Sequence, residues 1–193
     1  MSLIPEEFYL QDTLSAAREL LGKVLIKYEE DNNKILAGII IETEAYLGVN
    51  DAACHSFKMT AHKPGHRTEV MFRAGGCAYV YLIYGMYNCF NIVTREAGVA
   101  EAVLIRALEP LEGLDIMRER RNNNKDLCGG PGKICQAFNI TRNDNGVKLY
   151  LPESKLQVHD KNLNLNKNII AAPRINVDYA GADALLNYRF ILE

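Results

Sequence analysis

The sequence contains no hydrophobic run that approaches the length of a membrane span or of a signal-peptide core. Its five cysteines are an odd number and include no Cys-x-x-Cys pair, so neither a disulfide framework nor a zinc ribbon is indicated. We expect these thiols to be reduced and mostly buried. The absences predict a cytosolic protein, nucleoid-associated in a bacterium or nuclear in a eukaryote, with no membrane partner.

Internal repeats, low-complexity tracts and long linkers are also missing, which favours a single domain over residues 1–193. The content of 48% hydrophobic and 24% charged residues is that of an ordinary globular protein. A chain of 193 residues can bury a substantial core without disulfides or a structural metal, and it has room for one active site.

Neither sign of charge is in large excess, because the formal net charge is −2, and this argues mildly against a nucleic-acid partner. The basic residues are nevertheless clustered in two stretches. Each stretch alone is as easily a solvated surface as a phosphate contact, but two of them flanking a tyrosine-rich segment favour a track for a nucleic-acid backbone. The stretches contain Lys58, Lys63, Arg67 and Arg73, and Arg118, Arg120, Arg121, Lys125 and Lys133.

The order of predicted elements indicates an α+β fold with a mainly antiparallel, curved sheet and surrounding helices. A helix is predicted over 13–21, with Asp12 or Thr13 as N-cap and Gly22 as its stop, and a β-hairpin over 23–28 and 35–44 that turns at 31–33. The segment 48–76 has no sustained period and is expected to be a long functional loop. Further strands are expected at 77–83, 89–94 and 102–107 and near Leu149, Val158 and Ile175, and further helices at 111–121, 134–138 and 181–186.

Four of the nine residues from Tyr79 to Tyr87 are tyrosines, more than a structural strand needs. Strand alternation places Tyr79, Tyr81 and Ile83 on one face, and Gly85 allows a hairpin tip at 84–86 that presents large side chains beyond the sheet.

Upstream of this run, Glu44 lies at the end of a predicted strand among apolar neighbours. Aromatic faces beside a shielded carboxylate suit a pocket for a flat, electron-poor ring, such as a flipped nucleobase. A glycine-rich run at 129–133 precedes a predicted helix, where backbone amides could accept a phosphate, although such runs usually mark turns.

Several ordered blocks resemble the alkyladenine (3-methyladenine) DNA glycosylase family of the mammalian type, and together they extend over nearly the whole chain. The blocks are IETEAYLG (41–48), ACHS (53–56), MF (71–72), YVYLIYGMYNCFN (79–91), LIRALEPLEG (104–113), GPGKICQA (130–137), RINVDYAG (174–181) and RF (189–190). The chain departs from the family at 65–68, where Gly-His-Arg-Thr replaces Thr-Pro-Arg-Asn, and at Tyr188, near the family's usual Trp.

The resemblance implies a compact fold without a metal or other cofactor, and a monofunctional glycosylase of base excision repair. Its partner would be double-stranded DNA that contains alkylated or deaminated purines, including 3-methyladenine, 7-methylguanine, hypoxanthine and ethenoadenine. A monomer is the expected state of an enzyme that scans a duplex.

By this resemblance Glu44 is the catalytic carboxylate, and Arg106 and the backbone carbonyl of Ile175 help to position a water molecule. A carboxylate can act as general base toward that water and stabilise the cationic sugar. Glu42, two residues away on the same strand face, is the rival for this role but matches a non-catalytic position. An ordinary structural ion pair is the alternative role for Arg106.

The resemblance also implies a base pocket and a DNA-contacting surface. Aromatic walls attract a cationic alkylpurine through the ring quadrupole, and an inserted side chain fills the gap that the extruded base leaves. The pocket residues are Tyr46, His55, Tyr81 and Asn91, with Asn91 on the floor where it would crowd the exocyclic amine of guanine. The contact residues are Tyr84, as the intercalating side chain, with Met86, Tyr87, Arg67 and Lys133.

Two functions from other classes remain open from the residues alone. A hydrolase of free nucleosides would use the same acid and aromatics but would not need an exposed Tyr84 or two basic stretches. A nucleic-acid-binding module without catalysis would tolerate the loss of Glu44.

Overall fold

A computed structural model of the chain describes residues 1–29, 34–161 and 168–193. It shows a nine-stranded sheet in which β1, β7, β2, β3, β6, β5 and β4 follow one another, with β9 joining β3 and β8 joining β9. All strand pairs are antiparallel. The strands are β1 (Ser2–Leu3), β2 (Val24–Tyr28), β3 (Ile35–Tyr46), β4 (Ala78–Ile83), β5 (Tyr87–Thr94), β6 (Glu101–Glu112), β7 (Leu156–Asp160), β8 (Ile169–Ala172) and β9 (Arg189–Leu192).

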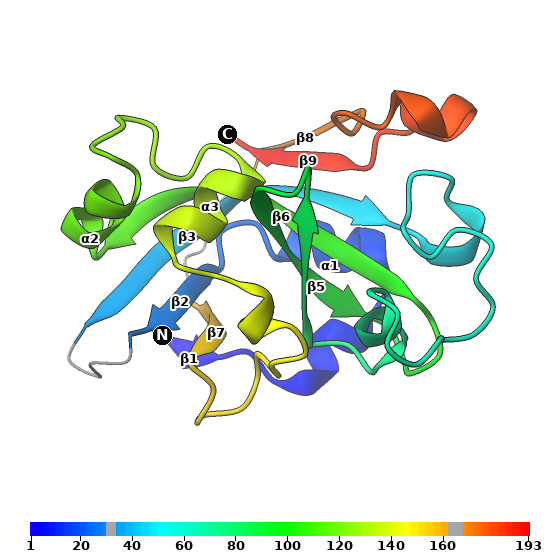
Figure 1. Ribbon diagram of the computed structural model, residues 1–193, viewed down its shortest axis with the longest axis horizontal. Coiled ribbons are helices and arrows are strands. Elements are labelled where there is room, and N and C mark those ends of the chain that lie inside the picture. The colour runs from blue at the N-terminus through cyan, green and yellow to red at the C-terminus, as the bar shows by residue number, and fades with distance from the viewer. Residues whose placement is uncertain (30–33, 162–167) are drawn as a thin grey trace.

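Helices cover the sheet, as Figure 1 shows, with α3 in front of the strands and α1 behind them. They are α1 (Thr13–Glu19), α2 (Leu114–Arg120) and α3 (Pro131–Ala137), and short 3-10 helices η1 (Glu6–Leu10), η2 (Gly48–Asn50), η3 (Glu69–Phe72), η4 (Arg142–Asp144) and η5 (Asp178–Leu185). This architecture confirms the predicted α+β class with a mainly antiparallel sheet. Within the described residues no helix is long and apolar enough to cross a membrane.

The helix α1 forms where the sequence predicts it. Asp12 is its N-cap, and the Asp12 carboxylate accepts the backbone N–H of Ser15, one of the donors that a helix start leaves without an internal partner. Its apolar face packs on β3 and β6, and the hydroxyl of buried Thr43 donates to the Ala17 carbonyl at 2.8 Å. Thr43 therefore faces α1, and strand alternation directs Glu44 to the opposite face of the sheet.

The β2–β3 and β4–β5 hairpins also match prediction. The strands β2 and β3 pair in antiparallel register, while the predicted turn at 31–33 lies outside the described residues.

The segment between β3 and β4 contains only short 3-10 turns, as expected for a long loop. All five cysteines are buried, which confirms the expectation of internal thiols.

Three predicted elements are wrong in type or position. The helix predicted at 111–121 starts at Leu114, because β6 continues through Pro110 and ends where Gly113 takes a left-handed φ of 78°. Near Leu149 there is only an isolated bridge between Lys148 and Cys77.

The segment around Ile175 is a bend rather than a strand. Pro173 cannot donate to a strand ladder, and Asn176 has a left-handed φ of 60°. The Ile175 N–H bonds instead to the side chain of Glu44, at 2.9 Å. Strands β1, β8 and β9 were not predicted.

Candidate active site

A single row of side chains across four strands makes the floor of the main cavity. The register pairs Tyr79 of β4 with Asn91 of β5, Asn91 with Leu104 of β6, and Leu104 with Glu44 of β3. Directly opposed residues of an antiparallel sheet point to the same face, so this register brings together residues that are 60 positions apart in the chain. All four line the same cavity, of about 580 Å³.

Arg106 reaches this floor because of a β-bulge. Thr43 pairs with Ile105 and Glu42 with Ala107, so Arg106 is an extra residue on β6 at a register shift. Bulges re-aim side chains and are common beside active sites. Arg106 Nε lies 3.6 Å from Glu44 Oε1 and 3.2 Å from Glu42 Oε1.

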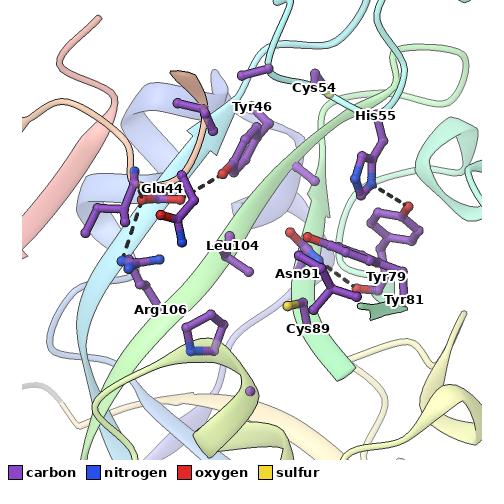
Figure 2. A pocket seen from close by; sticks show the side chains of 18 of the residues that line it. Glu44, Tyr46, Cys54, His55, Tyr79, Tyr81, Cys89, Asn91, Leu104 and Arg106 are labelled. Carbon is purple, nitrogen blue, oxygen red and sulfur yellow. Dashed lines mark hydrogen bonds and ion pairs between the residues drawn. The ribbon is translucent and has the colours of Figure 1, made fainter. Parts of the chain in front are cut away.

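The Glu44 carboxylate is completely buried and each of its oxygens is held by a different donor. Oε1 accepts the Ile175 N–H at 2.9 Å, and Oε2 accepts the Tyr46 hydroxyl at 2.8 Å. In Figure 2, Tyr46 and Arg106 approach the carboxylate from two different sides. The carboxylate is therefore fixed in orientation before any ligand enters.

Burial raises the pKa of Glu44, and this desolvation outweighs the Arg106 charge and the bonds from Ile175 and Tyr46, which lower it. A carboxylate with a raised pKa is a stronger base than a solvated one. Burial and the neighbouring Glu44 charge also raise the pKa of Tyr46, so its hydroxyl stays protonated and remains a donor.

Aromatic side chains form the opposite side of the cavity (Figure 2). The His55 and Tyr81 rings meet edge to face with centroids 4.4 Å apart, and the Tyr79 hydroxyl lies 3.0 Å from His55 Nδ1. Burial, followed by the Arg67 charge, lowers the pKa of His55 to about 4, so the imidazole is neutral at physiological pH. The Asn91 amide donates from Nδ2 to the Tyr79 carbonyl at 3.1 Å, which fixes its position on the floor.

Exposed apolar side chains surround the entrance to the cavity at the β4–β5 hairpin tip. Tyr84 is 77% exposed and Met86 is 69% exposed, and Tyr84 has a left-handed φ of 53°. Tyr84 and Tyr87 belong to the lining of the cavity. Large exposed apolar groups at a cavity mouth are typical of a surface that binds a partner.

A buried ion pair between Arg174 and Asp51 lies beside Tyr46 and connects the segments that form the site. Both guanidinium Nη atoms of Arg174 donate to the Asp51 carboxylate, at 2.5 and 2.8 Å, and Nη1 also donates to the Ala45 carbonyl. The Arg174 guanidinium carbon lies 4.8 Å from the centroid of the Tyr46 ring. Asp51 in turn accepts the backbone N–H groups of Leu47 and Ala53. The pair thus joins the Ile175 segment, the end of β3 and the loop that carries His55.

The two basic stretches differ in the structure. Most of the second is engaged in ion pairs, with Arg120 bonded to Glu29, Arg118 to Asp115 and Lys133 to Asp126 at 2.5 Å. In the first, Lys58, Lys63 and Arg67 are exposed, and no salt bridge involves them within the described part of the chain.

The glycine-rich run at 129–133 also has an internal hydrogen-bond partner. The Gly129 N–H donates to Asp126 Oδ1, so one of the amides expected to meet a phosphate already has a carboxylate partner.

The structure gathers most of the predicted site residues. Those that line the cavity are Glu44, Tyr46, His55, Tyr81, Tyr84, Tyr87, Asn91, Arg106 and Ile175. Arg67, Lys133 and Met86 are not part of that lining. For Ile175, the contact with Glu44 is made by the backbone N–H, whereas the resemblance implied a role for its carbonyl.

Sequence reasoning did not assign roles to several other members of the site. Tyr79 was visible through strand alternation with Tyr81, but its bond to His55 depends on the loop conformation. Tyr179 and Cys89 line the cavity, and the Asp51–Arg174 pair spans 123 positions of sequence, for which no local pattern exists.

A buried carboxylate facing an aromatic cavity is a site for acid–base chemistry on a flat ring. Residues 7–193 match the family model of methylpurine-DNA glycosylase. Proteins that carry the name 3-methyladenine DNA glycosylase are 48% identical in Methanocella arvoryzae, over 98% of this chain and 92% of that protein, and 46% identical in Bdellovibrio bacteriovorus, over 98% and 95%. One from Bacillus mycoides is 43% identical over 98% of this chain and 95% of its own.

The chain belongs to the methylpurine-DNA glycosylase family. It is a hydrolase of N-glycosyl bonds, and its substrate is DNA with damaged bases.

Proposed function

We propose that this enzyme flips alkylated or deaminated purines out of duplex DNA and hydrolyses their N-glycosidic bond with a water molecule activated by Glu44. The observation that carries the proposal is the fully buried Glu44 carboxylate, fixed by Tyr46 and Ile175 on the floor of an aromatic cavity. The proposed substrates are 3-methyladenine, 7-methylguanine, hypoxanthine and ethenoadenine.

Glu44 has an acceptor position available for water. Each carboxylate oxygen can accept two hydrogen bonds. Oε1 accepts the Ile175 N–H and faces Arg106, whereas Oε2 accepts only the Tyr46 hydroxyl among the described residues. The second acceptor position of Oε2 would therefore receive one proton of the attacking water.

Bond cleavage builds positive charge on the deoxyribose, and the Glu44 anion stabilises that charge. The glycosidic electron pair leaves with the purine, the water oxygen bonds to the anomeric carbon, and its proton passes to Glu44. The products are the free base and an intact abasic site, without a covalent intermediate.

The cavity is suited to an extruded purine in size and in surface. Its volume of about 580 Å³ falls within the usual range for small-molecule sites, about 300–1,000 Å³. Tyr46 stands on the Glu44 side, and His55 and Tyr81 stand opposite, so a base between them would contact aromatic faces (Figure 2). Because His55 is neutral, it does not repel a cationic alkylpurine.

The exposed hairpin tip fits the requirement that the base must leave the helix. Extrusion costs a few kcal/mol of stacking and pairing, and an inserted apolar side chain offsets part of it. Tyr84 would enter the duplex, with Met86 and Tyr87 in the minor groove. Arg67 and Lys133 would contact phosphates, Lys133 after exchanging its Asp126 partner for one.

A duplex oligonucleotide with one hypoxanthine or ethenoadenine tests the proposal. Incubation with the enzyme followed by alkali should cleave the damaged strand, and borohydride should trap no protein–DNA adduct. A free-nucleoside hydrolase would act equally well on the modified nucleoside. A binding module would retain the duplex without cleaving it, and a trapped adduct would contradict the water mechanism.

A further inference from the structure

Glu42 lies outside the cavity lining, but its carboxylate shares Arg106 with Glu44. Arg106 Nε is 3.2 Å from Glu42 Oε1 and 3.6 Å from Glu44 Oε1. The same Glu42 oxygen accepts a hydrogen bond from Arg189 Nη1 at 2.9 Å. One guanidinium thus stands between two carboxylates, and a second guanidinium binds the carboxylate of Glu42, which is not part of the cavity lining.

Three adjacent strands fix this arrangement. Glu42 pairs with Ala107 of β6 on one side and with Ile191 of β9 on the other, and the bulge directs Arg106 toward β3. Arg189 is anchored separately, since its Nε donates to the Pro173 carbonyl at 2.9 Å. The strand pairing and the side-chain contacts together hold the four charged groups close to one another.

Water screens these charges only weakly. The side-chain exposures are 0% for Glu44, 16% for Arg106, 19% for Glu42 and 21% for Arg189. At such exposures the effective dielectric constant is far below that of water, so a small change in the position of Arg106 changes the charge that Glu44 experiences.

We propose that Glu42 and Arg189 are positioning residues that act through Arg106 and set how much of its positive charge reaches Glu44. This role rests on the proposed function, in which Glu44 is the general base. Glu42 holds Arg106 back from a closer pair with Glu44, so that Glu44 remains basic enough to take a proton from water. Arg189 neutralises Glu42, which prevents Glu42 from drawing Arg106 away completely.

Other groups also face Glu44 and would contribute a constant background. The Arg174 charge is matched by its buried partner Asp51, and the Tyr46 hydroxyl and the Cys89 thiol are neutral because burial raises the pKa of each. The groups that act on Glu44 are Glu42 and Tyr46 from β3, Cys89 from β5, Arg106 from β6, and Arg174 and the Ile175 N–H from the segment before η5.

The proposal predicts opposite effects for two conservative variants. Glu42→Gln removes a like charge and frees Arg106 to approach Glu44, so the pKa of Glu44 falls. Arg189→Gln leaves Glu42 with Arg106 alone, so the pKa of Glu44 rises. The measurement is the rate of single-turnover excision of hypoxanthine from a duplex as a function of pH. The acidic limb, in which the rate rises as Glu44 loses its proton, should shift by about one pH unit to lower pH in Glu42→Gln and by about one pH unit to higher pH in Arg189→Gln.

Two further variants separate charge from structure. Arg189→Lys keeps the charge and lacks the Nε donor, so its acidic limb should coincide with that of the unmodified enzyme. Glu112→Gln makes the same chemical change as Glu42→Gln at an exposed position of β6 and should also leave the limb in place. If Arg189→Lys moves the limb as Arg189→Gln does, the lost Pro173 contact is responsible and the proposal is overturned.

The remaining outcomes are equally decisive. Limbs that do not move, or that move in the same direction for Glu42→Gln and Arg189→Gln, exclude the proposed sharing of Arg106. If Glu42→Gln does not fold, the comparison of Arg189→Gln with Arg189→Lys carries the test. Glu44→Gln is assayed in parallel: full activity there would overturn the proposed function itself, whereas an inactive Glu44→Gln with unmoved limbs overturns only this inference.

Discussion

At the floor of the cavity the Glu44 side chain is fully buried and bonded through both oxygens, whereas at the entrance Tyr84 leaves 77% of its surface exposed. The floor is built from a continuous row of paired strands, and the entrance from a hairpin tip in left-handed conformation. The groups proposed for chemistry are therefore organised before the substrate arrives. Tyr84 and Met86, which are proposed to contact DNA, are mostly exposed and would be covered only in a complex.

This difference separates two kinds of energetic role. A buried, oriented carboxylate avoids reorganisation during the reaction, at the cost of desolvating a charge. An exposed tyrosine contributes little to folding and can instead use its aromatic surface to offset the unstacking of DNA. Substitutions at the floor should change the chemistry or the stability, and substitutions at the tip should change the use of duplex DNA.

The largest effect is expected for Glu44→Gln. This change removes the proposed general base and its charge but keeps the side-chain shape, and loss of a general base typically costs about 10²–10⁴ in rate. Single-turnover excision should fall accordingly, while binding of lesion-containing duplex stays close to that of the unmodified enzyme. Excision within threefold of the unmodified rate would exclude Glu44 and direct attention to Glu42.

The next largest effect is expected for Arg174→Met, which leaves Asp51 buried without its cation. Breaking one side of a buried pair costs about 3–5 kcal/mol. Chemical denaturation should show this loss for Arg174→Met and almost none for Tyr84→Ala. Equal stabilities of the two variants would mean that the ion pair does not support the floor.

Tyr84→Ala should act at the entrance only. Loss of an inserted aromatic ring should weaken binding to, and excision from, duplex DNA by about 1–3 kcal/mol, because stacking of a base on an aromatic side chain has that magnitude. Cleavage of a free modified nucleoside, where it is measurable, should be nearly unchanged. Equal losses on both substrates would mean that Tyr84 acts on the base in the cavity rather than on the duplex.

Asn91→Ser should alter selectivity more than rate. If the Asn91 amide collides with the 2-amino group of guanine and leaves that donor poorly paired, the mismatch costs about 1–3 kcal/mol. The variant should release normal or mismatched guanine more readily, with a smaller change for adenine. Unchanged rejection of guanine would remove Asn91 from the selectivity site without affecting the proposed mechanism.

The smallest effect concerns stability against pH. Because burial raises the pKa of Glu44 in the folded state, the folded protein holds this proton to higher pH than the unfolded chain does. Stability from this group is therefore lost as pH rises from the unfolded pKa through the folded one. Glu44→Gln should melt at a higher temperature than the unmodified enzyme near neutral pH, and this advantage should shrink below the unfolded pKa. An advantage that grows on acidification would contradict the raised pKa.

Local patterns were sufficient where short-range physics decides the structure. Helix α1 was predicted from apolar spacing, its Asp12 cap and Gly22, and the β4–β5 hairpin from alternating tyrosines around Gly85. Glu44 and the aromatic residues were found because they lie in distinctive runs, and the family resemblance added Arg106 and Asn91. Wrong predictions occurred where a long-range contact overrides local preference, as at Ile175, whose N–H bonds to Glu44 instead of a strand partner.

Local sequence is sufficient for the alternation that separates Thr43 from Glu44, for the caps and turns, and for the residue types available for the chemistry. The shared row of Tyr79, Asn91, Leu104 and Glu44 arises in the folded protein, because strand register depends on pairing between distant segments. The same holds for the bulge at Arg106 and for the buried bond of Arg174 to Asp51. The raised pKa of Glu44 is likewise a property of the folded state, because it is caused by burial and the side chain is buried only after folding.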